Sequence, residues 1–404
     1  MNTSIEPAPA RGAGVCFLLD WEVTLKCNLD CSYCGKWSHD NSTQHPPLSE
    51  CIKTIDFMFD YVDLYMEHKA KWSRDVVLNV YGGESLFHPD IVKIHTLIKE
   101  KHKEKFADKW KLIVSTTTNL VVGPTILKSL IPHIDEWTVS YHTEANDKQK
   151  KQMKDNLLYL KENGCNIRVT ILLNPARFED ALSMIDFCKE HGLKHVPRQL
   201  DHSEKLTQFN YKAEHLDWFE KFYNEKKEIS VENIKTKKEN LPVEDTKSTV
   251  VSNTNTIQIS NNITIEKKDN TNLTQIGRAC CGNRQLCVSQ KYKEREYFIP
   301  NQLKGYSCSV NWFFLFIKQY TGDIYNNKDC QMKFDGTVGP IGNLENSDLL
   351  ITQLKTWLDA KEMPIIKCAK SMCYCGLCAP KAKTEEIFRQ IMPKYLTGNP
   401  FTAP

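Results

Sequence analysis

Three cysteines stand close together after the first apolar run of the chain, in the segment Cys27-Asn28-Leu29-Asp30-Cys31-Ser32-Tyr33-Cys34. Their C-x3-C-x2-C spacing lets three thiolates on one short loop face three corners of a [4Fe–4S] cube. The fourth iron is then left without a protein ligand, so a substrate or cofactor can bind there. Two other interpretations stay open: three buried cysteines, or three of the four ligands of a zinc ion.

Cysteine is abundant for a protein of this kind, with 16 among 404 residues. A disulfide framework would need an exported chain, and the first residues lack a basic segment followed by an apolar one. We therefore expect metal ligation and a cytoplasmic protein.

No apolar run reaches bilayer length, so no membrane partner is expected. The 53 basic and 50 acidic residues give a net charge of +3, which does not indicate a general nucleic-acid binder.

A second group of cysteines follows residue 277, where nine of the 16 are found. Four of them lie within 11 residues, and two more stand upstream. The candidate metal ligands of this group are Cys308, Cys330, Cys368, Cys373, Cys375 and Cys378. This density predicts a small domain organised around metal. Four sulfurs suit either an iron–sulfur cluster or a structural zinc ion, and both alternatives stay open.

The elements that must hold the first cysteines come from an alternation of apolar runs and amphipathic stretches. Strands are predicted at 16–24, 75–81, 111–117, 136–141, 166–173 and 194–200. Helices are predicted at 48–68, 89–105, 124–132, 147–163, 178–191 and 213–228. Because parallel strands need long crossovers, six strand–helix units predict an α/β fold with a parallel sheet. Six units are two short of a closed (β/α)8 barrel, which favours a partial (β/α)6 barrel resembling a TIM barrel.

The predicted organisation has four parts: a flexible tail at 1–14, the barrel at 15–230, an Asn/Ser/Thr-rich linker or hairpin insertion at 231–276, and the cysteine-rich domain at 277–404. Within the insertion, the alternation around Ile259 and Ile263 resembles a hairpin. A two-residue turn would place the isoleucines of its two strands on opposite faces. A three-residue loop would place them on one face. A bulged hairpin or disorder is therefore expected.

The segment TLKCNLDCSYC resembles the cluster loop of the radical S-adenosylmethionine (radical SAM) superfamily. In that family the open iron chelates the amino and carboxylate groups of S-adenosylmethionine. The resemblance places Tyr33 near the adenine. The second predicted strand ends in Tyr81-Gly82-Gly83-Glu84, which resembles the family's GGE motif. It implies that Gly82 and Gly83 let the backbone approach the ligand, and that Glu84 accepts a hydrogen bond from the methionine ammonium.

Other strand ends resemble the family less closely. Asn119 follows the third strand where the family often has a Thr-Asn-Gly turn, with Leu120 in place of the glycine. Ser140 matches a serine that bonds the cofactor in the family, and His142-Thr143 replaces an Asp-Gly pair. His142 is a candidate proton donor or substrate contact, and a strand-end histidine held only by hydrogen bonds is the alternative. Further candidates at strand ends are Asn174, Arg198, Gln199 and Asp201, with Asn174 assigned to the cofactor and Asp201 to catalysis.

The C-terminal cysteines resemble the SPASM/Twitch extension of radical SAM enzymes, which holds auxiliary [4Fe–4S] clusters. The order of Cys308, Gly322, Cys330 and the segment Ile341-Gly342-Asn343-Leu344 before the terminal cysteines carries this resemblance. The match is partial, because Asn327 stands where the usual hairpin has a cysteine and the terminal spacing is tighter. One auxiliary cluster is expected, with zinc as the alternative.

The resemblance implies that a reduced cluster cleaves S-adenosylmethionine to a 5′-deoxyadenosyl radical, which abstracts hydrogen from a substrate. It also implies a reducing partner such as flavodoxin or ferredoxin. SPASM relatives favour a peptide or protein substrate, although the barrel begins by residue 16 and leaves no room for a preceding leader-recognition domain. A nucleotide, nucleic acid or small metabolite is the alternative substrate. A zinc-stabilised binding protein is the non-enzymatic alternative.

Overall fold

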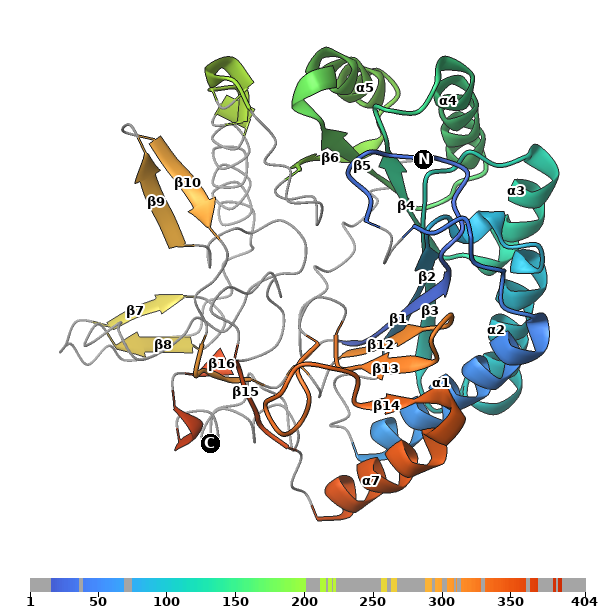
Figure 1. Ribbon diagram of the computed structural model, residues 1–404, viewed down its shortest axis with the longest axis vertical. Helices are drawn as coiled ribbons and strands as arrows, with labels where there is room; N and C mark the ends of the chain where they lie inside the picture. Colours follow the sequence, from blue (N-terminus) through green and yellow to red (C-terminus); the bar gives the residue numbers. More distant parts are fainter. Residues whose placement is uncertain are drawn as a thin grey trace, which may run out of the picture.

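The structure, a computed structural model, describes residues 16–35, 39–68 and 75–200 and, with short gaps, parts of 211–222, 256–266, 288–299, 304–369 and 381–386. Six parallel strands lie side by side in chain order, and helices cover one face of the sheet (Figure 1). The strands are β1 (Cys16–Thr24), β2 (Asp75–Gly82), β3 (Lys111–Thr118), β4 (Glu136–Tyr141), β5 (Ile167–Leu173) and β6 (Lys194–Gln199). The helices are α1 (Leu48–His68), α2 (Ile91–Lys105), α3 (Pro124–Leu130), α4 (Asp147–Glu162) and α5 (Phe178–Glu190). No helix among the described residues is long and apolar enough to span a membrane.

The predicted parallel α/β architecture is confirmed. All six barrel strands and the first five helices begin and end within two residues of their predicted bounds. The agreement is close because turn residues mark the ends of these elements. Gly164 and Gly192 end α4 and α5 with positive φ angles of 71° and 57°, a conformation that favours glycine. Asn146 begins α4 with a capping box that it forms with Gln149.

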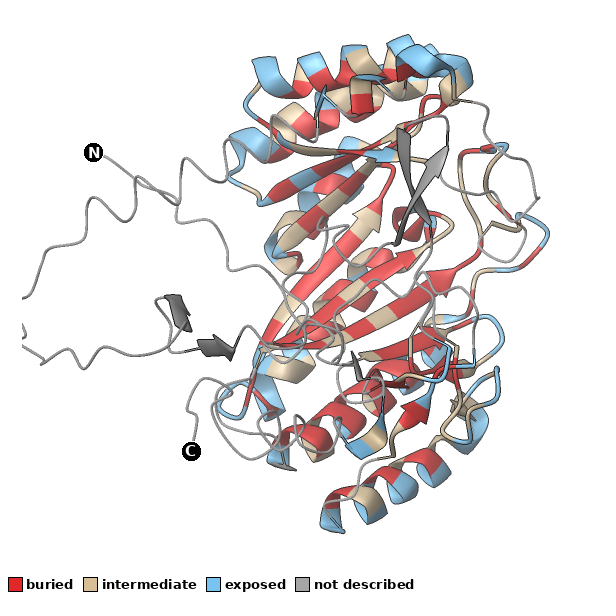
Figure 2. Cartoon of the chain, turned by 90° about the vertical axis from the view of Figure 1, so that its left-hand side faces the viewer, coloured by how far each residue is buried: buried red, intermediate tan, exposed pale blue. Residues whose placement is uncertain are grey.

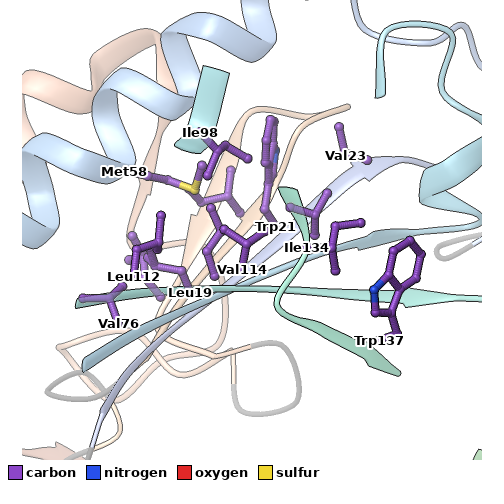
Figure 3. Close-up of a cluster of buried hydrophobic side chains, with 14 of the residues drawn as sticks. Leu19, Trp21, Val23, Met58, Val76, Ile98, Leu112, Val114, Ile134 and Trp137 are labelled. Atoms are coloured by element: carbon purple, nitrogen blue, oxygen red, sulfur yellow. The ribbon is translucent and has the colours of Figure 1, made fainter. Parts of the chain in front are cut away.

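The core lies between the sheet and its helices. On β1, Phe17, Leu19, Trp21 and Val23 alternate toward the helices and are essentially fully buried. Figure 3 shows Trp21 and Leu19 packed among Met58, Ile98 and Val114 from neighbouring elements. Burial of each such side chain contributes roughly 1.5–3 kcal/mol. The helices keep their exposed residues on the outer side, as Figure 2 shows, so their apolar faces cover the sheet.

A later part of the chain continues the barrel sheet beyond β1. Strand β12 (Phe314–Lys318) pairs in parallel with β1, and β13 (Asp323–Tyr325) and β14 (Gly342–Asn343) follow it antiparallel. The nine-stranded order is β14-β13-β12-β1-β2-β3-β4-β5-β6. Helix α7 (Ser347–Asp359) lies beside α1 (Figure 1). Sequence analysis assigned this segment to the C-terminal domain, and in the structure its strands share the sheet of the barrel.

A buried hydrogen-bond junction fastens β12 to the barrel. The indole nitrogen of Trp21 donates to Gln319 Oε1 at 2.9 Å, and Thr54 Oγ1 donates to the same oxygen at 2.7 Å. Gln319 is 5% exposed, and these two donors satisfy its amide oxygen where water does not reach it. The junction joins the end of β12 to β1 and α1.

Three smaller sheets contain the remaining named strands of the described residues. Strand β11 (Ser307–Cys308) pairs with β15 (Ile366–Lys367) on one side and β16 (Lys381–Ala382) on the other. Strands β9 (Val288–Tyr292) and β10 (Arg295–Ile299) form a hairpin. Strands β7 (Thr256–Ile259) and β8 (Ile263–Glu266) form the hairpin expected in the insertion. Their register pairs Ile259 with Ile263, which leaves three residues in the loop between the two strands.

His95, on α2, is a fully buried histidine whose two ring nitrogens have no hydrogen-bond partner among the described residues. Burial lowers its pKa to about 3. As the pH falls below about 6.5, the unfolded chain binds a proton at this site and the folded chain does not. Stability is therefore lost as the pH falls from about 6.5 toward 3.

We expect His95→Leu to raise the free energy of unfolding by about 1–3 kcal/mol at pH 7.5, because an unpaired buried polar group is removed. The gain should be roughly 2 kcal/mol larger at pH 5, where the unfolded parent chain is protonated. Urea unfolding at both pH values measures this difference. His191→Leu, at the C-terminal end of α5, is the control. A variant that gains nothing at either pH would contradict the prediction.

Candidate iron–sulfur and cofactor site

The segment after β1, residues 25–35, is here called the cluster loop, and backbone hydrogen bonds hold it at the ends of β1 and β2. The amides of Gly83 and Glu84 donate to the carbonyls of Thr24 and Lys26, both at 2.8 Å. Within the loop the amide of Cys34 donates to the carbonyl of Cys31 at 3.0 Å. The loop is therefore a fixed extension of β1 that brings its three cysteines to the carboxyl end of the sheet, where parallel barrels carry out their chemistry.

The three thiols of the loop lie together and form no disulfide. Cys31 and Cys34 hydrogen-bond each other through their side chains. The Leu29 amide and the Asn119 side-chain amide donate to Cys27 Sγ at 3.4 and 3.8 Å. Such N–H donors stabilise sulfur that carries negative charge, and hydrogen bonds to sulfur tune iron–sulfur clusters. This donor set fits a [4Fe–4S] cluster bound by three thiolates.

The protonation of these thiols follows from their burial. Burial raises the pKa of Cys27 to about 12. The hydrogen bond with Cys34, together with burial, raises the pKa of Cys31 far above its usual range. A metal must therefore displace protons to bind here, so its affinity falls with falling pH. Within the described ranges, no group of three or more His, Cys, Asp or Glu side chains has the arrangement of a single-ion site.

Gly82 and Gly83 are required by the close approach of the end of β1 and the start of the cluster loop. A Cβ on Gly82 would lie 2.3 Å from Thr24 O, and one on Gly83 would lie 2.5 Å from Leu25 O and 2.6 Å from Lys26 O. These contacts are with backbone atoms, which cannot swing away. The family resemblance implied that the glycines make room for a ligand. The structure shows that Gly82 already makes room for the end of β1, and Gly83 for the loop that carries the cysteines.

Glu84 follows these glycines and is 2% exposed. Its Oε1 accepts from the Leu86 amide at 2.9 Å and from Thr118 Oγ1 at 2.7 Å, and its Oε2 accepts from the Asn119 amide at 2.5 Å. Burial raises its pKa to about 7, against the effect of these hydrogen bonds. The carboxylate therefore ties the end of β2 to the end of β3. Oε1 accepts from two protein donors and Oε2 from one, so Oε2 has more room to accept a hydrogen bond from a ligand.

Asn119 and Leu120 form the turn after β3. The Asn119 side chain donates to Cys27 Sγ and, at 2.7 Å, to Asn28 Oδ1, while its own Oδ1 accepts from the Val121 amide. Asn119 thus reaches the cluster loop directly. Leu120 has a φ of 59° and is fully buried. It adopts a left-handed conformation at the position where the family often has glycine, at a cost of about 1–2 kcal/mol.

This positive φ reverses the usual order of stability of an alanine and a glycine variant at a buried position. Leu120→Ala and Leu120→Gly should each lose about 2–5 kcal/mol, because both remove a buried side chain. The glycine variant should be more stable than the alanine variant by about 1 kcal/mol, since only glycine adopts the positive φ without strain. At Leu127, buried in helix α3, the order should be the opposite. Denaturant unfolding of the four variants measures both orders. Alanine more stable than glycine at residue 120 would contradict the strain.

His142 lies directly after β4 and contacts the cluster loop. Its Nδ1 is 2.7 Å from Tyr33 Oη and 3.5 Å from Cys31 Sγ, and its ring stacks on Tyr33 with centroids 6.0 Å apart. Burial lowers the pKa of His142 to about 4, so the ring is neutral at pH 7. Tyr33, which the family resemblance places near the adenine, hydrogen-bonds with His142 and Cys31 in the structure. A small pocket between the cluster loop and α4 is lined by Asn119, Ser140 and His142, three of the predicted site residues.

Asn174 lies at the end of β5, among the side chains that surround the cluster loop. Its Nδ2 donates to Glu144 Oε1 at 2.9 Å, and its Oδ1 accepts from the Ala176 amide. Sequence analysis did not single out Glu144, which also binds Ser32 of the cluster loop. The only sequence indication was its place three residues after β4, where a polar side chain at a barrel strand end is expected to face the site.

Two of the C-terminal cysteines lie in the small sheet formed by β11, β15 and β16. Cys308 pairs with Ile366, and the Cys368 amide donates to the carbonyl of Tyr306 at 2.9 Å. Cys368 is therefore two residues beyond the partner of Cys308 on the neighbouring strand, so both side chains share one face. Both are buried, at 4% and 8% exposure. The sequence between β15 and β16 contains the other three terminal cysteines, and both strands flank Cys308.

The remaining predicted ligands and one predicted catalytic residue lie outside the described residues: Cys330, Cys373, Cys375, Cys378 and Asp201. Arg198 and Gln199 form the end of β6. The structure thus brings together Cys27, Cys31, Cys34, Tyr33, Gly82, Gly83, Glu84, Asn119, Ser140, His142 and Asn174 at the carboxyl ends of β1 to β5.

The chain matches no protein-family model and no curated protein. Solved structures with a similar backbone include SuiB of Streptococcus suis bound to S-adenosylmethionine, with 15% identity, a TM-score of 0.38, and coverage of 53% of this chain and 49% of that chain. Another is anSMEcpe with bound AdoMet and the Kp18Cys peptide, with 15% identity, a TM-score of 0.39, and coverage of 52% and 61%. A third is HydG, a maturase of the [FeFe]-hydrogenase, with 14% identity, a TM-score of 0.33, and coverage of 51% and 49%. The chain spans about half to three fifths of the length of these proteins.

Proposed function

We propose that this chain is a radical SAM enzyme. The observation that carries the proposal is the cluster loop: three thiols that form no disulfide lie on one loop, which backbone hydrogen bonds fasten to a Gly-Gly-Glu turn at the neighbouring strand end. In this proposal Cys27, Cys31 and Cys34 hold a [4Fe–4S] cluster with one open iron. The cluster and S-adenosylmethionine would supply reductive cleavage of the cofactor to a 5′-deoxyadenosyl radical that abstracts hydrogen from the substrate.

The protein's part in this chemistry is to hold and orient. Glu84 fixes β2 to β3 beside the cluster loop, and the free capacity of its Oε2 suits the ammonium group of a methionine moiety. A cation there would favour the ionised carboxylate, whose pKa burial has raised to about 7. Asn119 donates to Cys27 Sγ, and the pocket lined by Ser140 and His142 lies next to it. S-adenosylmethionine is also the ligand in the SuiB and anSMEcpe structures named above.

We further propose an auxiliary metal site in the C-terminal segment, with Cys308 and Cys368 as ligands on one face of the small sheet. Cys330, Cys373, Cys375 and Cys378 are the further candidates. One [4Fe–4S] cluster is the proposed occupant, with zinc as the alternative. As the substrate we propose a peptide or protein side chain, which the resemblance to SPASM enzymes favours, and as the reducing partner flavodoxin or ferredoxin. One of the similar structures, anSMEcpe, contains a bound peptide. A small metabolite or nucleotide is the second substrate class.

Anaerobic reconstitution tests the proposal. Iron, acid-labile sulfide and zinc are counted per chain, and 5′-deoxyadenosine is measured after addition of S-adenosylmethionine and dithionite. We expect roughly four iron atoms for each bound cluster, an EPR signal that changes on addition of S-adenosylmethionine, and formation of 5′-deoxyadenosine. Zinc without iron and no cleavage product would overturn the proposal in favour of a zinc-stabilised binding protein.

A further inference from the structure

The turn between β4 and α4, residues 142–146, contacts three consecutive residues of the cluster loop. His142 meets Cys31 and Tyr33, as described above. Two residues later, Glu144 meets Ser32, which lies between them. Ala145 packs against Leu29 and Cys31. This turn is the part of the barrel that faces the middle of the loop, between the second and third cysteines.

Glu144 makes the shortest of these contacts. Its Oε2 accepts from the Ser32 amide at 2.6 Å, and its Oε1 accepts from Ser32 Oγ at 2.7 Å. The same Oε1 accepts from Asn174 Nδ2 at 2.9 Å, at the end of β5. One carboxylate therefore joins the loop to the ends of two barrel strands. Hydrogen bonds to an ionised acceptor are about twice as strong as neutral ones, so this junction holds the loop more firmly than a neutral side chain would.

We propose that Glu144 is a positioning residue for the cluster: it fixes Ser32 between two cysteine ligands, and its negative charge makes the cluster harder to reduce and so a stronger reductant. The inference rests on the proposed function, because it assigns a cluster to the loop. The charge lies close to the cluster position, since the Glu144 carboxylate oxygens are 2.6 and 2.7 Å from the amide and hydroxyl of Ser32, the residue directly after Cys31. The potential of an iron–sulfur cluster falls as nearby negative charge increases.

The positioning half of the inference is tested on the metal-free protein, by hydrogen exchange of peptides that cover residues 27–35. Glu144→Ala should increase exchange in this segment at least about tenfold, because it removes both hydrogen bonds to Ser32. Asp155→Ala is the matched control, since this exposed carboxylate on α4 pairs only with Lys151 in the described structure. Unchanged exchange in Glu144→Ala, with the overall fold intact by circular dichroism, would overturn the positioning role.

The electrostatic half is tested on reconstituted protein, by redox titration of the cluster whose EPR signal responds to S-adenosylmethionine. Glu144→Gln removes the charge and should shift the ratio of reduced to oxidised cluster about tenfold toward reduced, equal to about 59 mV for one electron. Glu144→Asp keeps the charge and shortens the reach, so its potential should stay near that of the parent while loop exchange increases.

The outcomes separate this inference from the proposed function. A parent protein that binds no iron overturns the proposed function, and the exchange experiment still decides the positioning role. A parent that binds the cluster, with Glu144→Gln at the parent's potential, overturns the electrostatic role alone. A Glu144→Asp potential that moves as far as that of Glu144→Gln would also overturn it, because geometry rather than charge would then set the potential.

Discussion

Alanine at Cys27, Cys31 or Cys34 is expected to lower reductive cleavage of S-adenosylmethionine at least about 10³-fold, because a loop with two thiols no longer holds the cluster that supplies the electron. The three thiols lie together on a loop whose backbone is fixed to the second strand, so no other described cysteine can take the place of a lost one. The measurement is 5′-deoxyadenosine formed per chain under dithionite, together with iron and sulfide content.

Cys51→Ala and Cys188→Ala are the matched controls. Both cysteines are fully buried in helices of the barrel, among apolar side chains. Their loss should cost stability through packing and leave the cleavage rate per bound cluster near that of the parent. If the loop variants cleave S-adenosylmethionine as fast as these controls, the assignment of the cluster to Cys27, Cys31 and Cys34 is wrong.

Gly83→Ala is expected to displace the cluster loop and destabilise the protein by about 2–4 kcal/mol. The added Cβ would lie 2.5 and 2.6 Å from two carbonyl oxygens of the loop, so backbone must move. That movement would break the hydrogen bonds from the Gly83 amide to the end of β1 and from the Glu84 amide to the loop, both 2.8 Å long in the parent. We expect thermal unfolding at a lower temperature and at least about a tenfold faster loss of iron to a chelator.

Gly123→Ala is the control for this effect. No atom lies within 4 Å of a Cβ built on Gly123, and its φ of −65° suits any residue. Gly123 is the N-cap of α3, so alanine there should change stability by less than about 1 kcal/mol. Equal unfolding temperatures for the two variants would show that the close approach at Gly83 is relieved without cost.

Sequence analysis predicted the barrel well because its patterns are local. Residues 16–24 alternate in hydrophobicity, the helix at 48–68 has its apolar residues at helical spacing, and strand–helix repetition implies a parallel sheet. The cysteine loop and the Gly-Gly-Glu turn were likewise contiguous motifs. Their meeting in space follows from adjacent parallel strands, whose carboxyl ends share one edge of the sheet.

The features that sequence analysis missed depend on contacts between distant residues. Nothing in the composition of the run at Phe314–Lys318 indicates that β1 is its partner. Glu144 is an ordinary carboxylate until the fold brings it to Ser32. Leu120 was noted as a replacement for glycine, and only the structure shows that it keeps the left-handed conformation that glycine would adopt. The functional roles of the site residues stay predictions, which the experiments above test.

The pairing of β12 with β1 has a consequence for how the chain reaches its native state. The buried hydrogen bond between Trp21 and Gln319 joins residues 298 positions apart, so one edge of the first barrel strand has no β12 partner until the last third of the chain is made. At roughly 5–20 residues per second on the ribosome, that interval lasts about 15–60 s. Through it the nascent barrel presents an open parallel edge, the kind of surface that pairs with other chains. Pairing of β12 with β1 is therefore expected to be slow and late. It should also depend on β1 being kept from pairing with other chains during synthesis.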